Sequence, residues 1–150
     1  GEYEQKTGEV LERYKAMGVT SVMFGDLFLE DIKEFRDNCL KKWGVNGIYP
    51  LWKVPTPLLA EHLFKKGFRT VLTCVDTQAI SKDFAGTEFD QNLLEKLPES
   101  VDPCGENGEF HTFVYDGPIF KKPVSFKKGA SFLKDDRFFY CDIEPVGGKV

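Results

Sequence analysis

Apolar residues recur at helical spacing in several parts of the chain, which has 150 residues. This spacing predicts helices over residues 2–17, 29–43 and 56–67. The first two end before Gly18 and Gly44, and a glycine after a helix favours the left-handed turn that terminates it. Thr56 and Pro57 form an N-cap and first-turn pair for the third helix. Asp90 can cap a further short helix.

Short apolar and β-branched runs between these helices predict strands. They lie at residues 19–24, 68–75 and 110–115, with an extended segment at 48–52. From Pro118 onward the pattern favours hairpins. These hairpin strands are expected at residues 119–126, 131–133 and 138–143, with turns at Lys128–Gly129 and Asp135–Asp136.

The order of these elements predicts an α/β fold. Helix, strand and helix in succession favour layers built on a parallel sheet. Three prolines between Tyr49 and Pro57 then interrupt the alternation. We therefore expect an α/β part at residues 1–48, followed by an α+β domain at residues 49–150 that ends in β-hairpins.

Composition narrows the class of protein. A chain with 41% hydrophobic and 14% aromatic residues can bury a core. The net charge of −4 argues against nucleic-acid or anionic-membrane binding, and the lysines of residues 121–134 are interpreted as a solvated hairpin face. No apolar run approaches a membrane span, and no signal-peptide pattern opens the chain. We therefore expect a cytoplasmic protein with reduced thiols.

The segment from Cys104 to Pro118 carries the densest candidate chemistry. Gly105 and Gly108 permit positive φ angles and a close approach of backbone to ligand. Glu106, Glu109 and His111 supply negative charge and a titratable imidazole. This pattern predicts a site for a polar or cationic ligand, and the alternative is an ordinary loop that leads into a buried strand.

Two other chemistries are weighed for the same segment. Cys104 and His111 could form a thiol nucleophile and its base, but the flanking carboxylates would raise the pKa of the thiol. Zinc binding by Cys74, Cys104, His111 and Cys141 lacks the close ligand spacing of structural zinc sites. We therefore predict no metal site formed by protein ligands alone.

The first part of the chain holds fewer candidates. Gly25 and Asp26 follow an expected parallel strand, where open α/β sheets bind ligands, although most such pairs only form turns. Arg36 could pair within its helix or reach an anionic ligand, and Trp52 could be a stacking platform or a core residue. Neither a Gly-x-x-x-x-Gly-Lys-Ser/Thr nor a Gly-x-Gly-x-x-Gly loop occurs. Any ATP site would need residues from elsewhere.

Several of these motifs together resemble the diphthine–ammonia ligase family of N-type ATP pyrophosphatases. The matching motifs are Phe24-Gly25-Asp26, Arg36 with Cys39, Pro50-Leu51-Trp52, Gly67-Phe68, Gly105 to Phe110, and Asp116-Gly117-Pro118. The resemblance covers about residues 1 to 120, and Gly105 to Phe110 is its most specific part. Residues 25–31 look more like the bacterial branch of the family.

The resemblance has implications for the fold. Residues 1–48 would be the tail of a Rossmann-like, adenine nucleotide α-hydrolase-like domain of the PP-loop (HUP) class. Residues 49–150 would be the substrate-recognition domain. The family's Ser-Gly-Gly-Lys-Asp-Ser phosphate loop does not occur in these 150 residues and is expected upstream. The fragment alone is expected to be inactive.

The resemblance also implies an activity and the residues that serve it. The family cleaves ATP to AMP and pyrophosphate, adenylates a carboxylate and lets ammonia displace AMP, so ATP and Mg²⁺ are the expected cofactors. The catalytic residues would be Glu106, Glu109 and His111. Substrate would be bound by Gly105, Asn107, Gly108, Phe110, Thr112 and Trp52, and nucleotide by Gly25, Asp26 and Arg36.

The expected partners are a small or protein-borne carboxylate substrate and ammonia, in a monomer or a homodimer. In the family, the block that maps to residues 106–109 is associated with diphthine, whose trimethylammonium group carboxylates and an aromatic face such as Phe110 could hold. His111 and Thr112 stand where these ligases more often have Glu with Thr or Ser. The alternative function is a non-catalytic module whose acidic, glycine-rich loop binds a cationic ligand or protein tail.

Overall fold

The computed structural model describes residues 1–146. The chain divides into two compact units, Gly1–Val54 and Pro55–Val150, and each is described by itself. The division falls within the proline-containing segment where the sequence predicts a domain change. The interpretation of the first unit as part of a nucleotide-binding domain stays a prediction.

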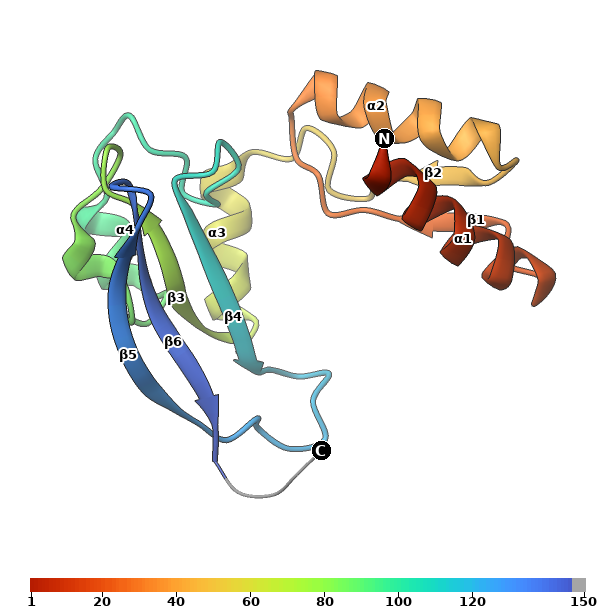
Figure 1. Cartoon of the computed structure of the whole chain (residues 1–150). Coiled ribbons are helices and arrows are strands. Elements are labelled where there is room, and N and C mark those ends of the chain that lie inside the picture. Colours follow the sequence, from red (N-terminus) through yellow and green to blue (C-terminus); the bar gives the residue numbers. More distant parts are fainter. Residues whose placement is uncertain (147–150) are drawn as a thin grey trace. The chain divides into compact units, whose positions relative to one another are not determined.

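The first unit is a small α/β layer (Figure 1). Its elements in chain order are α1 (Glu2–Ala16), β1 (Ser21–Met23), α2 (Glu30–Lys42) and β2 (Asn46–Ile48). The two strands pair in parallel, with Val22 opposite Gly47, as the helix–strand alternation predicts. Leu11, Leu40 and Val45 form the core of this unit. The larger Rossmann-like sheet implied by the resemblance stays a prediction, because residues 1–54 contribute only these two strands.

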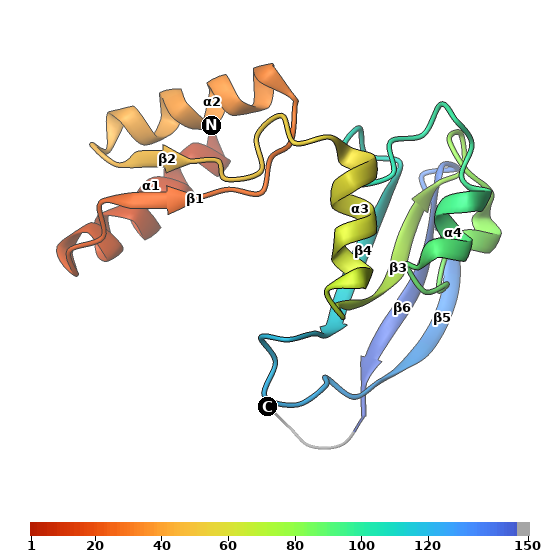
Figure 2. The ribbon, with the colours of Figure 1, turned by 180° about the vertical axis from the view of Figure 1, so that it is seen from behind.

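The second unit is built on a four-stranded antiparallel sheet in the order β4-β3-β6-β5. The strands are β3 (Arg69–Asp76), β4 (Phe110–Asp116), β5 (Phe126–Lys134) and β6 (Phe138–Pro145), and the helices are α3 (Thr56–Lys65), the single 3₁₀ turn η1 (Lys82–Phe84) and α4 (Gln91–Lys96). Figure 2 shows α3 and α4 on the same face of the sheet. Ala60 of α3 and Leu93 of α4 pack there with Leu72 and Phe110. The sheet thus has one face covered by helices.

The hairpin region differs from the prediction in two respects. Residues 119–125 form no strand, because Pro118 and Pro123 cannot donate to a ladder. Instead β5 runs through the predicted turn at Lys128–Gly129, where the pairing register with β6 shifts between Lys128 and Ser131. A bulge of this kind keeps the strand continuous. The turn at Asp135–Asp136 is confirmed, and both residues have positive φ.

The predicted helix ends are mostly confirmed. Gly18, Gly44 and Gly67 all have positive φ after their helices. The backbone N–H of Leu93 donates to Asp90 Oδ1 at 2.8 Å, so Asp90 caps α4. The predicted cap at Thr56 is wrong, because α3 begins at Thr56 and has Pro55 at its N-cap position. No helix within residues 1–146 is both long and apolar enough to cross a bilayer.

Candidate functional site

The candidate site is the acidic loop, defined as residues 102–109, which leads directly into β4. Asp102 organises this loop. Its Oδ2 accepts hydrogen bonds from the backbone N–H groups of Cys104, at 3.1 Å, and Glu106, at 2.9 Å. Its carbonyl oxygen accepts from the N–H of Gly105 at 2.8 Å. The sequence analysis did not single out Asp102, although an Asp before a glycine-rich turn is a common organiser of local backbone.

Two glycines give the acidic loop its path. Gly105 has a φ of +70° and Gly108 a φ of +88°, as the sequence predicts. A Cβ at Gly105 would lie 2.9 Å from the carbonyl oxygen of Phe110, whereas a Cβ at Gly108 would meet no heavy atom within 4 Å. Gly105 therefore serves a close backbone approach, and Gly108 serves the turn conformation alone.

Glu109 lies at the end of the acidic loop and is only 7% exposed. Its Oε1 accepts hydrogen bonds from the backbone N–H of Asp102 and from Nδ2 of Asn107, both at 3.0 Å. Within residues 1–146, its Oε2 is buried and has no hydrogen-bond partner. Burial alone would raise the pKa of Glu109, but hydrogen bonds from Asn107 and from backbone N–H groups outweigh burial and lower it. The side chain is therefore a buried, ionised carboxylate.

The other predicted substrate residues take different positions. Glu106 is half-buried, while Asn107, His111 and Thr112 are exposed. Phe110 is 4% exposed, and its ring centre lies 6.2 Å from that of Phe89 in the core. The structure thus gives Phe110 a packing role, and its contact with a ligand stays a prediction.

Cys104 has the environment of a structural thiol. Its Sγ donates to the carbonyl oxygen of Thr56 at 3.3 Å. Burial, together with the nearby charges of Asp102 and Glu106, raises the pKa of Cys104 to about 12. The nucleophilic pairing with His111 is therefore disfavoured. No group of three or more His, Cys, Asp or Glu residues in the described part of the chain is arranged to hold a metal.

In the first unit, two predicted nucleotide-binding residues form an ion pair. Arg36 Nε lies 3.1 Å from Oδ1 and 3.0 Å from Oδ2 of Asp26. The guanidinium also stands over the ring of Phe24, 4.7 Å from its centre. Strand β1 leads into Asp26 and α2 carries Arg36, so the pair joins a strand end to the following helix. Gly25, beside Asp26, is exposed.

A second cluster of polar and aromatic side chains in the first unit lies around Trp52. The Trp52 ring meets Tyr49 edge-on at 6.1 Å and lies 5.7 Å from Lys33 Nζ. The hydroxyl of Tyr49 donates to Asp37 Oδ1 at 2.8 Å, and burial with this contact raises the pKa of Tyr49. Trp52 is half-buried and belongs to the first unit, whereas the acidic loop belongs to the second. The sequence analysis missed this cluster because its members are spread over α2 and the segment after β2.

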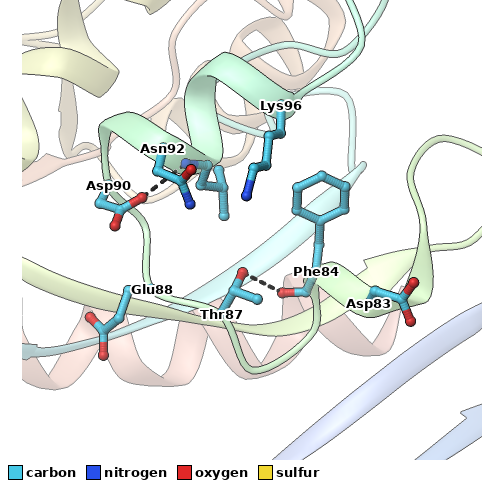
Figure 3. A pocket seen from close by; sticks show the side chains of 8 residues that line it. Asp83, Phe84, Thr87, Glu88, Asp90, Asn92 and Lys96 are labelled. Atoms are coloured by element: carbon cyan, nitrogen blue, oxygen red, sulfur yellow. Dashed lines mark hydrogen bonds between the residues drawn. The ribbon is translucent and has the colours of Figure 1, made fainter.

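The second unit also has a pocket of about 270 Å³ beside α4. Figure 3 shows its lining, which consists of Asp83, Phe84, Thr87, Glu88, Asp90, Asn92, Leu93 and Lys96. Two of its polar side chains serve the local fold: Thr87 Oγ1 donates to the Phe84 carbonyl at 2.7 Å, and Asp90 caps α4. None of the predicted site residues lines this pocket. The acidic loop therefore remains the candidate site of the second unit.

Comparison with known proteins identifies the family of the second unit. The family described as "diphthamide synthase C-terminal domain" matches residues 55–146. This match begins at Pro55, the first residue of the second structural unit, and includes the whole acidic loop. The chain therefore belongs to the diphthamide synthase C-terminal domain family.

Two relatives agree with this assignment. A diphthine–ammonia ligase of Schizosaccharomyces pombe is 27% identical over 92 residues, which cover 59% of this chain and 15% of the relative. A diphthine–ammonia ligase of Danio rerio is 27% identical over 140 residues, which cover 87% of this chain and 52% of the relative. The resemblance to this ligase family is thus confirmed. The chain spans about half of the zebrafish relative and a smaller share of the yeast one.

Proposed function

We propose that this chain is a portion of an ATP-dependent amide-forming ligase of the diphthine–ammonia ligase type. In the proposed reaction, ATP is cleaved to AMP and pyrophosphate, a carboxylate is adenylated, and ammonia displaces AMP to give an amide. Glu106, Glu109 and His111 would act near the substrate. Asp26 and Arg36 would lie near the nucleotide. The identity of the carboxylate is left open, with diphthine as one candidate.

One observation carries this proposal: the matched family region contains a preorganised acidic loop with a buried, ionised Glu109. Two hydrogen bonds to one of its oxygens hold the Glu109 carboxylate in a fixed position. Fixed charge of this kind is what a substrate site needs to orient a cationic group. An ordinary connecting loop does not require a buried charge.

The residues of this chain can form only part of an ATP site. No phosphate-binding glycine motif occurs among the 150 residues, and Arg36 is engaged with Asp26. We therefore assign no step of ATP cleavage to these residues. The proposed activity belongs to a longer protein, in which another segment supplies the phosphate loop and Mg²⁺ accompanies ATP.

Nucleotide products test the proposal. The full-length natural protein should be incubated with ATP, Mg²⁺, ammonium and a small-molecule extract of the source cells, and AMP and ADP separated by chromatography. We expect AMP that depends on both ammonium and extract. Glu109→Ala should abolish extract-dependent AMP, whereas Glu99→Ala, an exposed change before the acidic loop, should not.

The same experiment separates the ligase from a binding module. Formation of ADP instead of AMP would contradict an amide-forming ligase. AMP formation that Glu109→Ala leaves unchanged would contradict the use of this loop by the ligase. If no AMP forms with extract or with a diphthine-bearing protein, and the chain still binds a cationic ligand through Glu106 and Glu109, the non-catalytic binding module replaces the ligase.

A further inference from the structure

The cavity beside α4 contains hydrogen-bond donors that the fold does not use. Lys96 lines this cavity, and Figure 3 shows its side chain extending from α4 between Asn92 and Phe84. Among residues 1–146, the Lys96 ammonium group forms no ion pair and the Asn92 amide no hydrogen bond. One positive charge and one neutral donor are therefore left for an occupant.

Negative charge lines the same cavity. The Leu93 N–H donates to Oδ1 of Asp90, whereas Oδ2 of Asp90 has no partner in the described part of the chain. Asp83 and Glu88 are the other two carboxylates of the lining. Both oxygens of Glu88 accept from the hydroxyl of Tyr115 at 2.9 Å, so Glu88 contributes charge to the cavity but no free acceptor. The cavity thus presents unused groups of both signs.

Apolar side chains complete the wall, and the volume limits what can enter. Leu93 is 3% exposed, and the half-buried Phe84 packs against the core to which Leu93 belongs. The cavity of about 270 Å³ corresponds to about nine water molecules of about 30 Å³ each, so an occupant has about ten non-hydrogen atoms. A nucleotide is much larger. The cavity therefore suits a small molecule with polar ends and a short apolar body.

The lining sets three requirements for such a molecule. It needs an anionic group, because a carboxylate accepts hydrogen bonds from both an ammonium and an amide group. It needs a cationic donor for the free oxygen of Asp90. It also needs a net positive charge, since three carboxylates stand against one ammonium group in the lining. A basic α-amino acid of the size of lysine meets all three requirements.

We propose that the cavity beside α4 binds a free basic α-amino acid. The carboxylate of the ligand lies against Lys96 and Asn92, and its α-ammonium group donates to Asp90. Figure 3 shows Asp90 and Asp83 on opposite sides of the Lys96 side chain, so the ligand's methylene chain runs along Phe84 toward the charge of Asp83. None of the residues proposed for the ligase lines this cavity, so this binding does not depend on the proposed function.

Nuclear magnetic resonance of the ¹⁵N-labelled 150-residue chain tests the proposal. L-Lysine should be titrated at constant pH and ionic strength, with sodium chloride as the balancing salt. The reporters are the side-chain amide of Asn92 and the backbone amide of Leu93, which donates to Asp90. We expect both signals to shift and to saturate with a Kd on the order of 1 mM. Absent shifts, or shifts that grow without saturation, would overturn the proposal.

Two lysine substitutions test the role of Lys96. Lys96→Met removes the ammonium group and keeps an unbranched side chain, so binding of L-lysine should weaken at least about fivefold. Lys122→Met removes the same charge outside the cavity and should bind as the parent chain does. Both positions are exposed, so both variants should keep the fold. Binding that Lys96→Met leaves unchanged would contradict the carboxylate contact.

Three other ligands test the chemical class. L-Lysinamide lacks the carboxylate and Nα-acetyl-L-lysine lacks the α-ammonium group, and each should bind at least about fivefold more weakly than L-lysine. L-Glutamate keeps both α groups but adds negative charge, so it should also bind more weakly. Lysinamide binding as tight as that of lysine would overturn the amino-acid site in favour of simple attraction of cations.

The outcome is independent of the nucleotide assay of the ligase. Saturable binding of L-lysine without AMP formation would remove the proposed function alone. AMP formation without binding of L-lysine would remove this inference alone.

Discussion

Arg137 holds Asp76 across the sheet of the second unit. Nη2 and Nε of Arg137 donate to the same oxygen of Asp76, at 2.6 and 3.0 Å. The two residues are 61 positions apart, and the bond ties the end of β3 to the turn between β5 and β6. Asp76 is 5% exposed, and its other oxygen accepts from the backbone N–H of Gln78 at 3.0 Å. The Arg137 guanidinium holds the pKa of Asp76 below its ordinary value.

Replacement of Arg137 by methionine should destabilise the chain in a pH-dependent way. Because the folded pKa of Asp76 is depressed, its contribution is present above the unfolded pKa of about 3.9 and is lost as pH falls through the folded pKa. Urea unfolding should therefore show Arg137→Met as less stable than the parent near neutral pH. The gap should narrow in acid. Lys134→Met, an exposed change on β5, should show little effect, and a gap independent of pH would contradict this account.

The two glycines of the acidic loop should respond differently to alanine. Both substitutions place a side chain at positive φ, at a cost of roughly 1–2 kcal/mol. Only the new Cβ at position 105 would press on the backbone of Phe110. Gly105→Ala should therefore lower the free energy of unfolding by more than Gly108→Ala, as measured by urea denaturation. Equal losses would show that the close approach at Gly105 relaxes without penalty.

Loss of the Asp90 cap should weaken the second unit. Asp90→Ala removes the acceptor for the Leu93 N–H at the start of α4, and Leu93 is a core residue. We expect a loss of about 1 kcal/mol in the free energy of unfolding. Asn92→Ala, an exposed change in the same helix, is the matched control and should change it by only a few tenths of that amount. A larger loss of unfolding free energy in Asn92→Ala than in Asp90→Ala would contradict the stabilising role of the Asp90 cap.

Cys104 should react slowly with alkylating agents. The raised pKa of about 12 leaves almost no thiolate near neutral pH, and the thiol is half-buried with its hydrogen bonded to Thr56. Mass spectrometry after a timed iodoacetamide pulse should find Cys104 unmodified in the folded chain and modified after denaturation. Rapid labelling in the folded state would restore the thiol nucleophile as a hypothesis.

Local signals made much of the fold predictable. The glycines at 18, 44 and 67 mark helix ends because only a residue tolerant of positive φ fits there. The run at residues 68–75 is recognisable as a strand because it is rich in apolar and β-branched residues, and β3 is buried along most of its length at an inner position of its sheet. The extent of β5 was not predictable, since a bulge at Lys128–Gly129 and a turn have similar local sequences.

The candidate site was predictable in composition but not in geometry. The glycines and carboxylates of the acidic loop identified the segment, and the positive φ values of its two glycines are confirmed. The role of Asp102, the burial of Glu109 and the orientation of Phe110 depend on contacts that form only when the loop folds onto the sheet. Asp76 and Arg137 are linked by no motif, so only the structure reveals their bond.

The division at Pro55 has a consequence for how this protein can be handled. Each side of the division has its own sheet and its own set of buried residues, and the family match begins at the same residue. A cut between Val54 and Pro55 would thus separate the two compact units without splitting a helix or strand. Residues 55–146, the part that the family matches, carry the whole acidic loop on one side of that cut.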